Sequence, residues 1–418
     1  MVNNYLTNFK GFSKEIWILT FITFLNRAGT MVIPFLSKYM KENLSFSYSQ
    51  IGWIMFFFGV GSIIGSWLSG KLSDKIGFYK VMVFSLFTSG LIFIVLQYLT
   101  SFESLCIGIL ILTSVADMYR PAMLLALDTY ESKETKTRAL TLTRIAINTG
   151  FLIGPALGGL IIMKIGYSGL FWVDGLTCIL AISIFSIMIK EKKLPFKLKK
   201  IKSDTNSNKI IFNDKPFLLH LVITMATGIL FFQMFTTLPL YYKEQFNFTE
   251  FETGLLLSFS GLILILFELP IVRFVEEKNI DRIKVISLGI LSMSISLLLM
   301  LFSNWSGVLI LMVCFMSIGV MLTFPFANSF AMSRVHMNLK GRYIAIFTMS
   351  YSFAHILSAK MSMTIIEAYS YQANWIFMGT LGTVALILCY YLSIMLKKER
   401  KSIELKIKNS LFTEKKFS

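Results

Sequence analysis

Five ionisable side chains lie inside long apolar stretches, where an isolated charge is costly to bury in lipid. They are Arg27, Asp117, Arg120, Arg144 and Glu268. A carboxylate in such surroundings can carry a proton, because desolvation raises its pKa and a nearby arginine lowers it. A conformational change that alters the distance to the arginine then binds the proton on one side and releases it on the other. Asp117 is the first candidate for this proton coupling, and Glu268 is the second.

The same residues are compatible with fixed ion pairs. Asp117 and Arg120 are three residues apart, so they occupy neighbouring positions on a helix. Arg27 is an alternative partner for the same carboxylate. Glu268 stands just before Pro270, which is typical of a position near the end of a membrane span. Each carboxylate is therefore either a proton carrier or a permanent partner of an arginine.

Polar side chains accompany these charges. The arginines outnumber the single nearby aspartate, so anionic substrate groups, backbone carbonyls or water must supply the remaining partners. A lone histidine in an apolar stretch is either a proton switch or a hydrogen-bonded core residue. The candidates for lining a substrate cavity are Arg27, Asn26, Arg120, Arg144, Asn148 and His355.

The apolar stretches that position these residues run along the whole chain. The 418 residues are 55% hydrophobic and only 15% charged, whereas soluble domains carry about 25% charge. Stretches of about 20 apolar residues can span a bilayer. We predict an all-α membrane protein with twelve transmembrane helices over 15–38, 49–68, 80–99, 104–127, 138–163, 168–189, 216–241, 252–272, 283–302, 306–332, 342–366 and 373–396.

The twelve spans divide into two halves that look like repeats. The spacing from Pro121 to Arg138 recurs from Pro325 to Arg342, on either side of matching turns. Parallel six-helix halves are a known transporter plan. We predict an N-terminal six-helix bundle over 1–190, a basic linker over 191–215, a C-terminal six-helix bundle over 216–396 and a basic tail over 397–418.

The formal net charge of +17 is concentrated in the linker and the tail. By the positive-inside rule both segments and both termini face the cytoplasm, at a plasma membrane of the bacterial inner-membrane type. These segments are expected to contact anionic membrane lipid and not nucleic acid. The four cysteines lie far apart in apolar stretches, so neither disulfides nor a metal site is indicated.

Residues Gly70 to Gly77 form a short polar stretch that fits the pattern G-x-x-x-D-[RK]-x-G. We expect a tight turn between two spans, with Asp74 near a helix N-terminus, where a negative charge gains about 0.3–1 kcal/mol. The stretch resembles the best-known signature of the major facilitator superfamily of secondary transporters. The resemblance implies that it helps to hold the two halves in the outward-facing state. The alternative is an ordinary charged turn.

The sequence departs from this signature at one place. Two basic residues usually follow the second glycine, but Phe78 and Tyr79 stand here. In the superfamily the first base pairs with an acid at the end of span four, so Lys75 or Lys80 would have to substitute for it. The residues assigned to this conformational motif are Gly70, Asp74, Lys75, Gly77, Asp128 and Arg138.

Span five contains a second motif, G-x-x-x-G-P-x-x-G-G, formed by Gly150, Gly154, Pro155, Gly158 and Gly159. It resembles the signature of proton-coupled antiporters in the same superfamily. Small residues also let membrane helices approach closely. The motif therefore has either a part in antiport or a role in helix packing alone.

The stretch from Asn26 to Thr30, together with Arg120 and Pro121, resembles the drug:proton antiporter branch, which includes multidrug and small-peptide exporters. The resemblance implies a proton-coupled exporter of small organic molecules that works by alternating access. The alternative is a proton symporter that imports an anionic or zwitterionic metabolite or peptide. We expect no enzymatic activity, no cofactor beyond the proton gradient, and a monomer.

Overall fold

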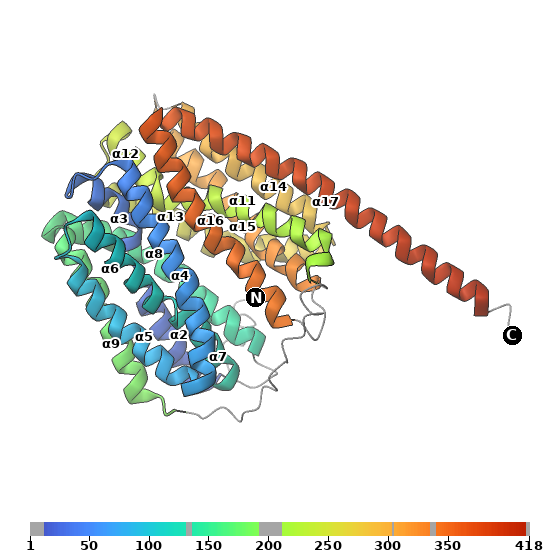
Figure 1. Cartoon of the computed structure of the whole chain (residues 1–418), viewed down its shortest axis with the longest axis horizontal. Coiled ribbons are helices and arrows are strands. Elements are labelled where there is room, and N and C mark those ends of the chain that lie inside the picture. Colours follow the sequence, from blue (N-terminus) through green and yellow to red (C-terminus); the bar gives the residue numbers. More distant parts are fainter. Residues whose placement is uncertain (1–11, 131–135, 192–210, 303–304, 335–339, 415–418) are drawn as a thin grey trace.

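The computed structural model of the chain describes residues 12–130, 136–191, 211–302, 305–334 and 340–414 (Figure 1). In this part of the chain, each predicted span lies on one helix or on two consecutive ones, so the predicted fold class is confirmed. The first half contains α2 (Lys14–Ala28), α3 (Val32–Glu42), α4 (Tyr48–Ile76), α5 (Phe78–Leu96), α6 (Phe102–Ala116), α7 (Tyr119–Tyr130), α8 (Lys136–Ile165) and α9 (Tyr167–Met188).

The second half repeats this arrangement. It contains α11 (Lys215–Thr236), α12 (Leu238–Phe246), α13 (Glu250–Glu277), α14 (Arg282–Leu298), the short 3-10 helix η1 (Leu299–Leu301), α15 (Val308–Ser333), α16 (Lys340–Ala368) and α17 (Tyr371–Glu414). Eleven spans in the described residues are long and apolar enough to cross a membrane. The remaining predicted span lies on α16, which carries His355 and Lys360 among its apolar residues.

The repeat extends to the helix caps. Ser47 caps α4 in a capping box with Gln50, and Thr249 caps α13 in a capping box with Glu252. In each box the hydroxyl accepts from a backbone N–H and the longer side chain accepts from the cap residue's own N–H. The two caps begin matching helices of the two halves, so local sequence sets the same start in both.

Span one is broken where the prediction has a continuous helix. α2 ends at Ala28 and α3 begins at Val32, with Gly29, Thr30 and Met31 between them. Span four is broken in the same way, because α6 ends at Ala116 and α7 begins at Tyr119. A break exposes backbone groups inside the membrane, which is tolerated where protein or a wet cavity satisfies them.

The two ends of the bundle differ in how the halves meet. We call the end where α9 finishes and α11 starts the linker end, and the opposite end the far end. At the far end α3 packs against α11 and α12 of the other half, and Figure 1 shows α3 and α12 together at the upper left. Along α4, Gly52 and Gly59 closely approach α16, whereas a Cβ added at Gly70 would meet no atom of another element within 4 Å. The contact between α4 and α16 is therefore close at Gly52 and Gly59 and does not extend to Gly70.

The predicted turn at residues 70–77 is wrong for all but its last residue. α4 continues as a helix to Ile76, and only Gly77 leaves it, with φ +90° before α5 begins. Asp74 thus lies in the last turn of α4, four residues before α5 begins at Phe78. Residues 71–76 contain neither proline nor glycine, so nothing in the sequence stops the helix before Gly77.

Helix α17 extends well beyond the bundle (Figure 1). Its 44 residues correspond to about 66 Å at 1.5 Å per residue, about twice the ~30 Å thickness of the bilayer's hydrocarbon core. The span predicted over 373–396 and the first part of the predicted tail are therefore one continuous helix.

Candidate functional site

A small cavity gathers several of the predicted residues in the first half. Asn26, Arg27, Asp117 and Arg120 line it, with contributions from α2, α3, α4, α5, α6, α7 and α9. Its volume is about 90 Å³, room for about three water molecules at ~30 Å³ each. The cavity can hold a charged group, but it is too small for a drug-sized molecule.

The breaks in spans one and four place the charges in this cavity. Arg27 precedes the break after α2, and Asp117 and Arg120 flank the break between α6 and α7. Arg27 lies within electrostatic range of both Asp117 and Arg120. Among the side chains that the structure describes, none of these three forms an ion pair or a side-chain hydrogen bond. The fixed ion pair considered from the sequence is thus not formed in this conformation.

Arg144 and Asn148 do not join this cluster. They lie on α8 and meet Glu268 on α13 of the other half: Arg144 Nη2 forms an ion pair with Glu268 Oε1. Asn148 Nδ2 donates to Glu268 Oε2 at 3.3 Å. Arg144, one of the three arginines that outnumber the nearby aspartate, therefore has a direct partner. That partner is Glu268, the second proton-coupling candidate.

His355 lies beside the cavity and not in it. Its ring packs against Phe232, with centroids 4.5 Å apart, and against Phe58 of the first half, at 4.8 Å. Phe58 itself lines the cavity. His355 Nδ1 is buried and lacks a hydrogen-bond partner among the described atoms. The side chain thus contributes to an aromatic contact between the two halves.

A carboxylate that the sequence analysis missed secures the break in span one. Asp174 on α9 is 0% exposed, and its oxygens accept from the backbone N–H groups of Met31 at 3.0 Å and Val32 at 2.8 Å. These N–H groups lie at the start of α3, where a helix has unpaired donors and partial positive charge. The sequence contained a signal for this residue, because an aspartate in the middle of a membrane span is expected to be functional or to have a partner.

We expect Asp174→Ala to destabilise the protein by about 2–3 kcal/mol, because it removes charge-assisted hydrogen bonds and leaves buried N–H groups unpaired. Thermal unfolding of the purified protein measures this as a lower midpoint. Asp174→Asn retains one acceptor oxygen and should lie between the alanine variant and the wild type. Equal midpoints for all three proteins would contradict the role assigned to Asp174.

A set of polar contacts at the far end joins the halves, and the sequence analysis did not predict it. Lys38 on α3 is fully buried, and its Nζ lies 2.9 Å from Glu250 Oε1. The same ammonium donates to the carbonyl of Phe248 at 3.2 Å. We call this set the far-end latch; its other pairs are Tyr48 with Glu244, at 2.6 and 2.7 Å, and Glu42 with Lys243, at 3.8 Å. Lys38 and Lys243 thus each have a partner across the halves.

The glycine motif of span five packs on two sides. A Cβ at Gly150 or Gly154 would approach the backbone of Arg27 and Ala28, next to the break in span one. A Cβ at Gly159 would instead meet Glu250 and Phe251 of the other half. Gly158 faces Met31 and Phe35, and Pro155 approaches Gly254. In this conformation the motif provides close packing at the first break and at the seam between α8 and α13.

We expect Gly159→Val to weaken closure of the far end several-fold. A Cβ at this position would lie 2.5 Å from the Glu250 carbonyl oxygen and 2.6 Å from Phe251 Cα, and backbone atoms cannot rotate away. Distances between labels on α3 and α12 would report the separation. Gly169→Ala is the matched control, because its nearest contacts are side chains of Ile165 and Ile161 in its own half. Unchanged label distances in Gly159→Val would contradict the packing argument.

Three residues of the conformational motif lie near the exposed end of α4. Gly70, Asp74 and Lys75 are exposed, and neither charged residue has an ion pair or hydrogen bond with another described side chain. Phe78 and Tyr79, which replace the usual bases, pack instead: Phe78 is buried, and Tyr79 Oη donates to the Ser186 carbonyl at 3.3 Å. The side chains of Asp128 and Arg138 lie outside the described residues.

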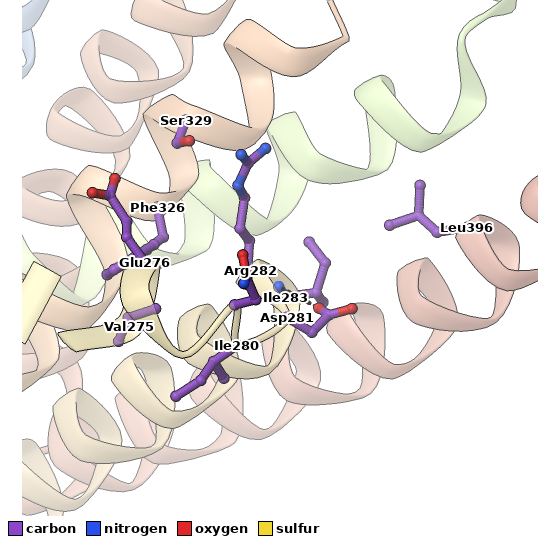
Figure 2. Close-up of a pocket in the computed structure, with 10 residues that line it drawn as sticks. Val275, Glu276, Ile280, Asp281, Arg282, Ile283, Phe326, Ser329 and Leu396 are labelled. Atoms are coloured by element: carbon purple, nitrogen blue, oxygen red, sulfur yellow. Dashed lines mark hydrogen bonds between the residues drawn. The ribbon is translucent and has the colours of Figure 1, made fainter. Parts of the chain in front are cut away.

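A second cavity, of about 460 Å³, lies within the second half at the linker end (Figure 2). The ends of α13 and α15, the start of α14 and Leu396 in the middle of α17 form it. It carries both acidic and basic side chains, Glu276, Asp281 and Arg282 among them. Each of the two cavities is lined by residues of one half alone, the first by residues within 26–178 and the second by residues within 275–396. The second cavity contains none of the residues predicted for the transport path.

Comparison with known proteins places the chain among transporters. A family model described as Major Facilitator Superfamily matches residues 16–359 and 242–416. The chain is 24% identical over 319 residues to the quinolone resistance protein NorA of Staphylococcus aureus strain MSSA476, which covers 72% of this chain and 78% of that protein.

Solved structures share the fold at low sequence identity. A crystal structure of the nucleoside transporter NupG matches with a TM-score of 0.75 at 16% identity, over 90% of this chain and 98% of that one. The peptide transporter POT in complex with sulfate matches with a TM-score of 0.78 at 13% identity, over 93% and 96%.

Proposed function

The chain belongs to the major facilitator superfamily, and from this premise we propose that it exports small organic molecules in exchange for protons. The observation that carries the proposal is Asp117, a carboxylate at a helix break that shares a cavity with Arg27 and Arg120 without an ion pair to either. A carboxylate can take up and release a proton when a conformational change alters its distance from arginine side chains. The efflux relative from Staphylococcus aureus supports the outward direction.

Alternating access gives each structural feature a place in the cycle. The lysine-rich linker puts the linker end in the cytoplasm by the positive-inside rule. The far-end latch then closes the protein to the outside, and the separated ends of α4 and α16 open it to the inside. In this conformation Asp117 releases its proton inward and the exported molecule enters between the halves. Opening the latch exposes the same cavity to the outside, where Asp117 is protonated again.

We further propose that the protein works as a monomer, since one chain supplies both halves and the charged cavity. No resident cofactor enters the cycle, because the proton gradient supplies the energy. The transported molecule is the small-molecule partner, and the bilayer is the lipid partner.

A second function is favoured by one specific observation. Two arginines and one aspartate leave the first cavity with an excess positive charge. A protonated Asp117 would strengthen binding of a purely anionic molecule, so proton and anion would move together. This is the behaviour of a proton symporter that imports an anionic or zwitterionic metabolite.

Transport measurements in vesicles separate the two functions. Purified protein is reconstituted, a pH gradient is imposed, and aromatic acids, bases and zwitterions are tested as solutes. Solute movement against the proton flow is expected for the exporter. Movement with the proton flow would overturn the exporter and support the symporter. Vesicles in which an ionophore has abolished the gradient are the control. The control variant is Lys14→Gln, which changes an exposed residue at the start of α2, outside the cavity.

A further inference from the structure

A group of aromatic rings in the second half lies next to the charged cavity, which it reaches through His355 and Phe58. On the second half, Phe231 contacts Phe232, Phe235 and Phe324, with ring centroids 4.9–5.5 Å apart. Phe324 stacks on Tyr351 at 5.2 Å and an interplanar angle of 19°. All of these rings are partly exposed and not sealed in the core. We call this group the aromatic wall.

The aromatic wall reaches the first half at three points. Phe235 lies 6.3 Å from Phe151, measured between ring centroids. Phe232 contacts His355, which in turn contacts Phe58 at the cavity. Tyr351 is close enough to Arg120 to interact with its charge. The charged cavity of the first half and the aromatic wall of the second half are therefore adjacent.

The charges of the cavity specify the polar groups of a ligand. Two guanidinium groups suit a carboxylate or a similar acidic group, which they can bind by paired hydrogen bonds. Asp117 suits a basic group such as an ammonium. The volume of about 90 Å³ admits these polar groups but not an organic skeleton, which would have to pack on the aromatic wall.

From this arrangement we propose that the exported molecules are aromatic zwitterions, with the acidic group on Arg27 and Arg120, the basic group on Asp117 and the body on the aromatic wall. This inference rests on the proposed export function and adds its substrate class. It also supplies the exchange step, because a proton and the basic group compete for the same carboxylate. Protonation of Asp117 from outside then releases the molecule, whereas a purely acidic molecule would not be displaced.

The test is equilibrium binding to the purified full-length protein, with one indole skeleton in three charge states. Tryptophan carries both groups, indole-3-propionate carries only the acid, and tryptamine carries only the base. Tryptophan is expected to bind about tenfold more tightly than either of the others. A preference for indole-3-propionate or tryptamine, or no binding of any of the three, would overturn the proposal.

Two variants give a crossed pattern that misfolding cannot produce. Arg27→Gln is expected to weaken binding of tryptophan and indole-3-propionate about tenfold and to leave tryptamine unchanged. Asp117→Asn is expected to weaken tryptophan and tryptamine and to leave indole-3-propionate unchanged. Lys14→Gln removes a positive charge from the same helix as Arg27, outside the cavity, and should bind all three like the wild type. Equal losses for all ligands in either cavity variant would contradict the assignment.

The binding experiment tests the substrate class independently of the direction of transport. A zwitterion preference with solute movement along the proton flow would retain the substrate class and reject export. Export of a solute that lacks either charge, without the crossed pattern, would retain export and reject the substrate class.

Discussion

Lys38→Ala is expected to shift the protein from the conformation closed at the far end to one open there. Lys38 is fully buried and bridges the halves through the Glu250 carboxylate and the Phe248 carbonyl. Breaking a buried ion pair by removing one partner costs about 3–5 kcal/mol. Glu250 retains 15% side-chain exposure, so we expect about 2 kcal/mol, which is ~30-fold in the conformational equilibrium.

Spin labels at the far end measure this shift. Asn43 and Gln245 are exposed positions on opposite halves and can carry the labels once the four native cysteines have been replaced. The distance between the labels should increase in Lys38→Ala. Lys164→Ala, which removes an exposed lysine from the first half, is the control and should match the wild type. An unchanged distance distribution in Lys38→Ala would show that the latch does not hold the far end closed.

Asp117→Asn is expected to abolish proton-driven transport, with a loss of at least ~100-fold, the lower range for removing a proton-transfer group. Asparagine has nearly the same shape but cannot bind and release a proton. Asp117 has no ion pair in the described structure, so its loss leaves no buried arginine partner stranded. The variant should therefore fold normally and lose proton coupling together with the binding of basic groups.

Two transport assays distinguish coupling from folding. Uptake driven by a pH gradient should disappear in Asp117→Asn. Without a gradient, the same variant should exchange labelled for unlabelled indole-3-propionate at the same rate as the wild type. Glu268→Gln is the informative comparison, because it tests the second carboxylate and breaks the pair with Arg144. Unchanged proton-driven transport in Asp117→Asn would remove Asp117 from the mechanism.

The parts of the fold that were predictable depend on local sequence. The span over 80–99 could be recognised because its apolar residues are consecutive, and α5 occupies Phe78–Leu96. The capping boxes at Ser47 and Thr249 are local for the same reason, since each involves residues only three apart. The family resemblance added the arrangement of two halves, which hydropathy alone cannot give.

The parts that were missed depend on contacts between distant residues. The break in span one needs Asp174, which lies 143 residues from Met31. The pair of Arg144 with Glu268 and the pair of Lys38 with Glu250 each join one half to the other. A charge in an apolar stretch indicates that a partner exists. It does not identify the partner, because the partner lies far away along the chain.

The continuous helix α17 gives this transporter a lever arm. Beyond residue 396 it extends for 18 further residues, about 27 Å at 1.5 Å per residue. A rotation of the second half by about 10° would sweep the tip of such an arm through about 5 Å, by the geometry of a helix of that length. Small angular motions during transport are therefore magnified at residue 414, where a single fluorophore could follow the cycle in real time.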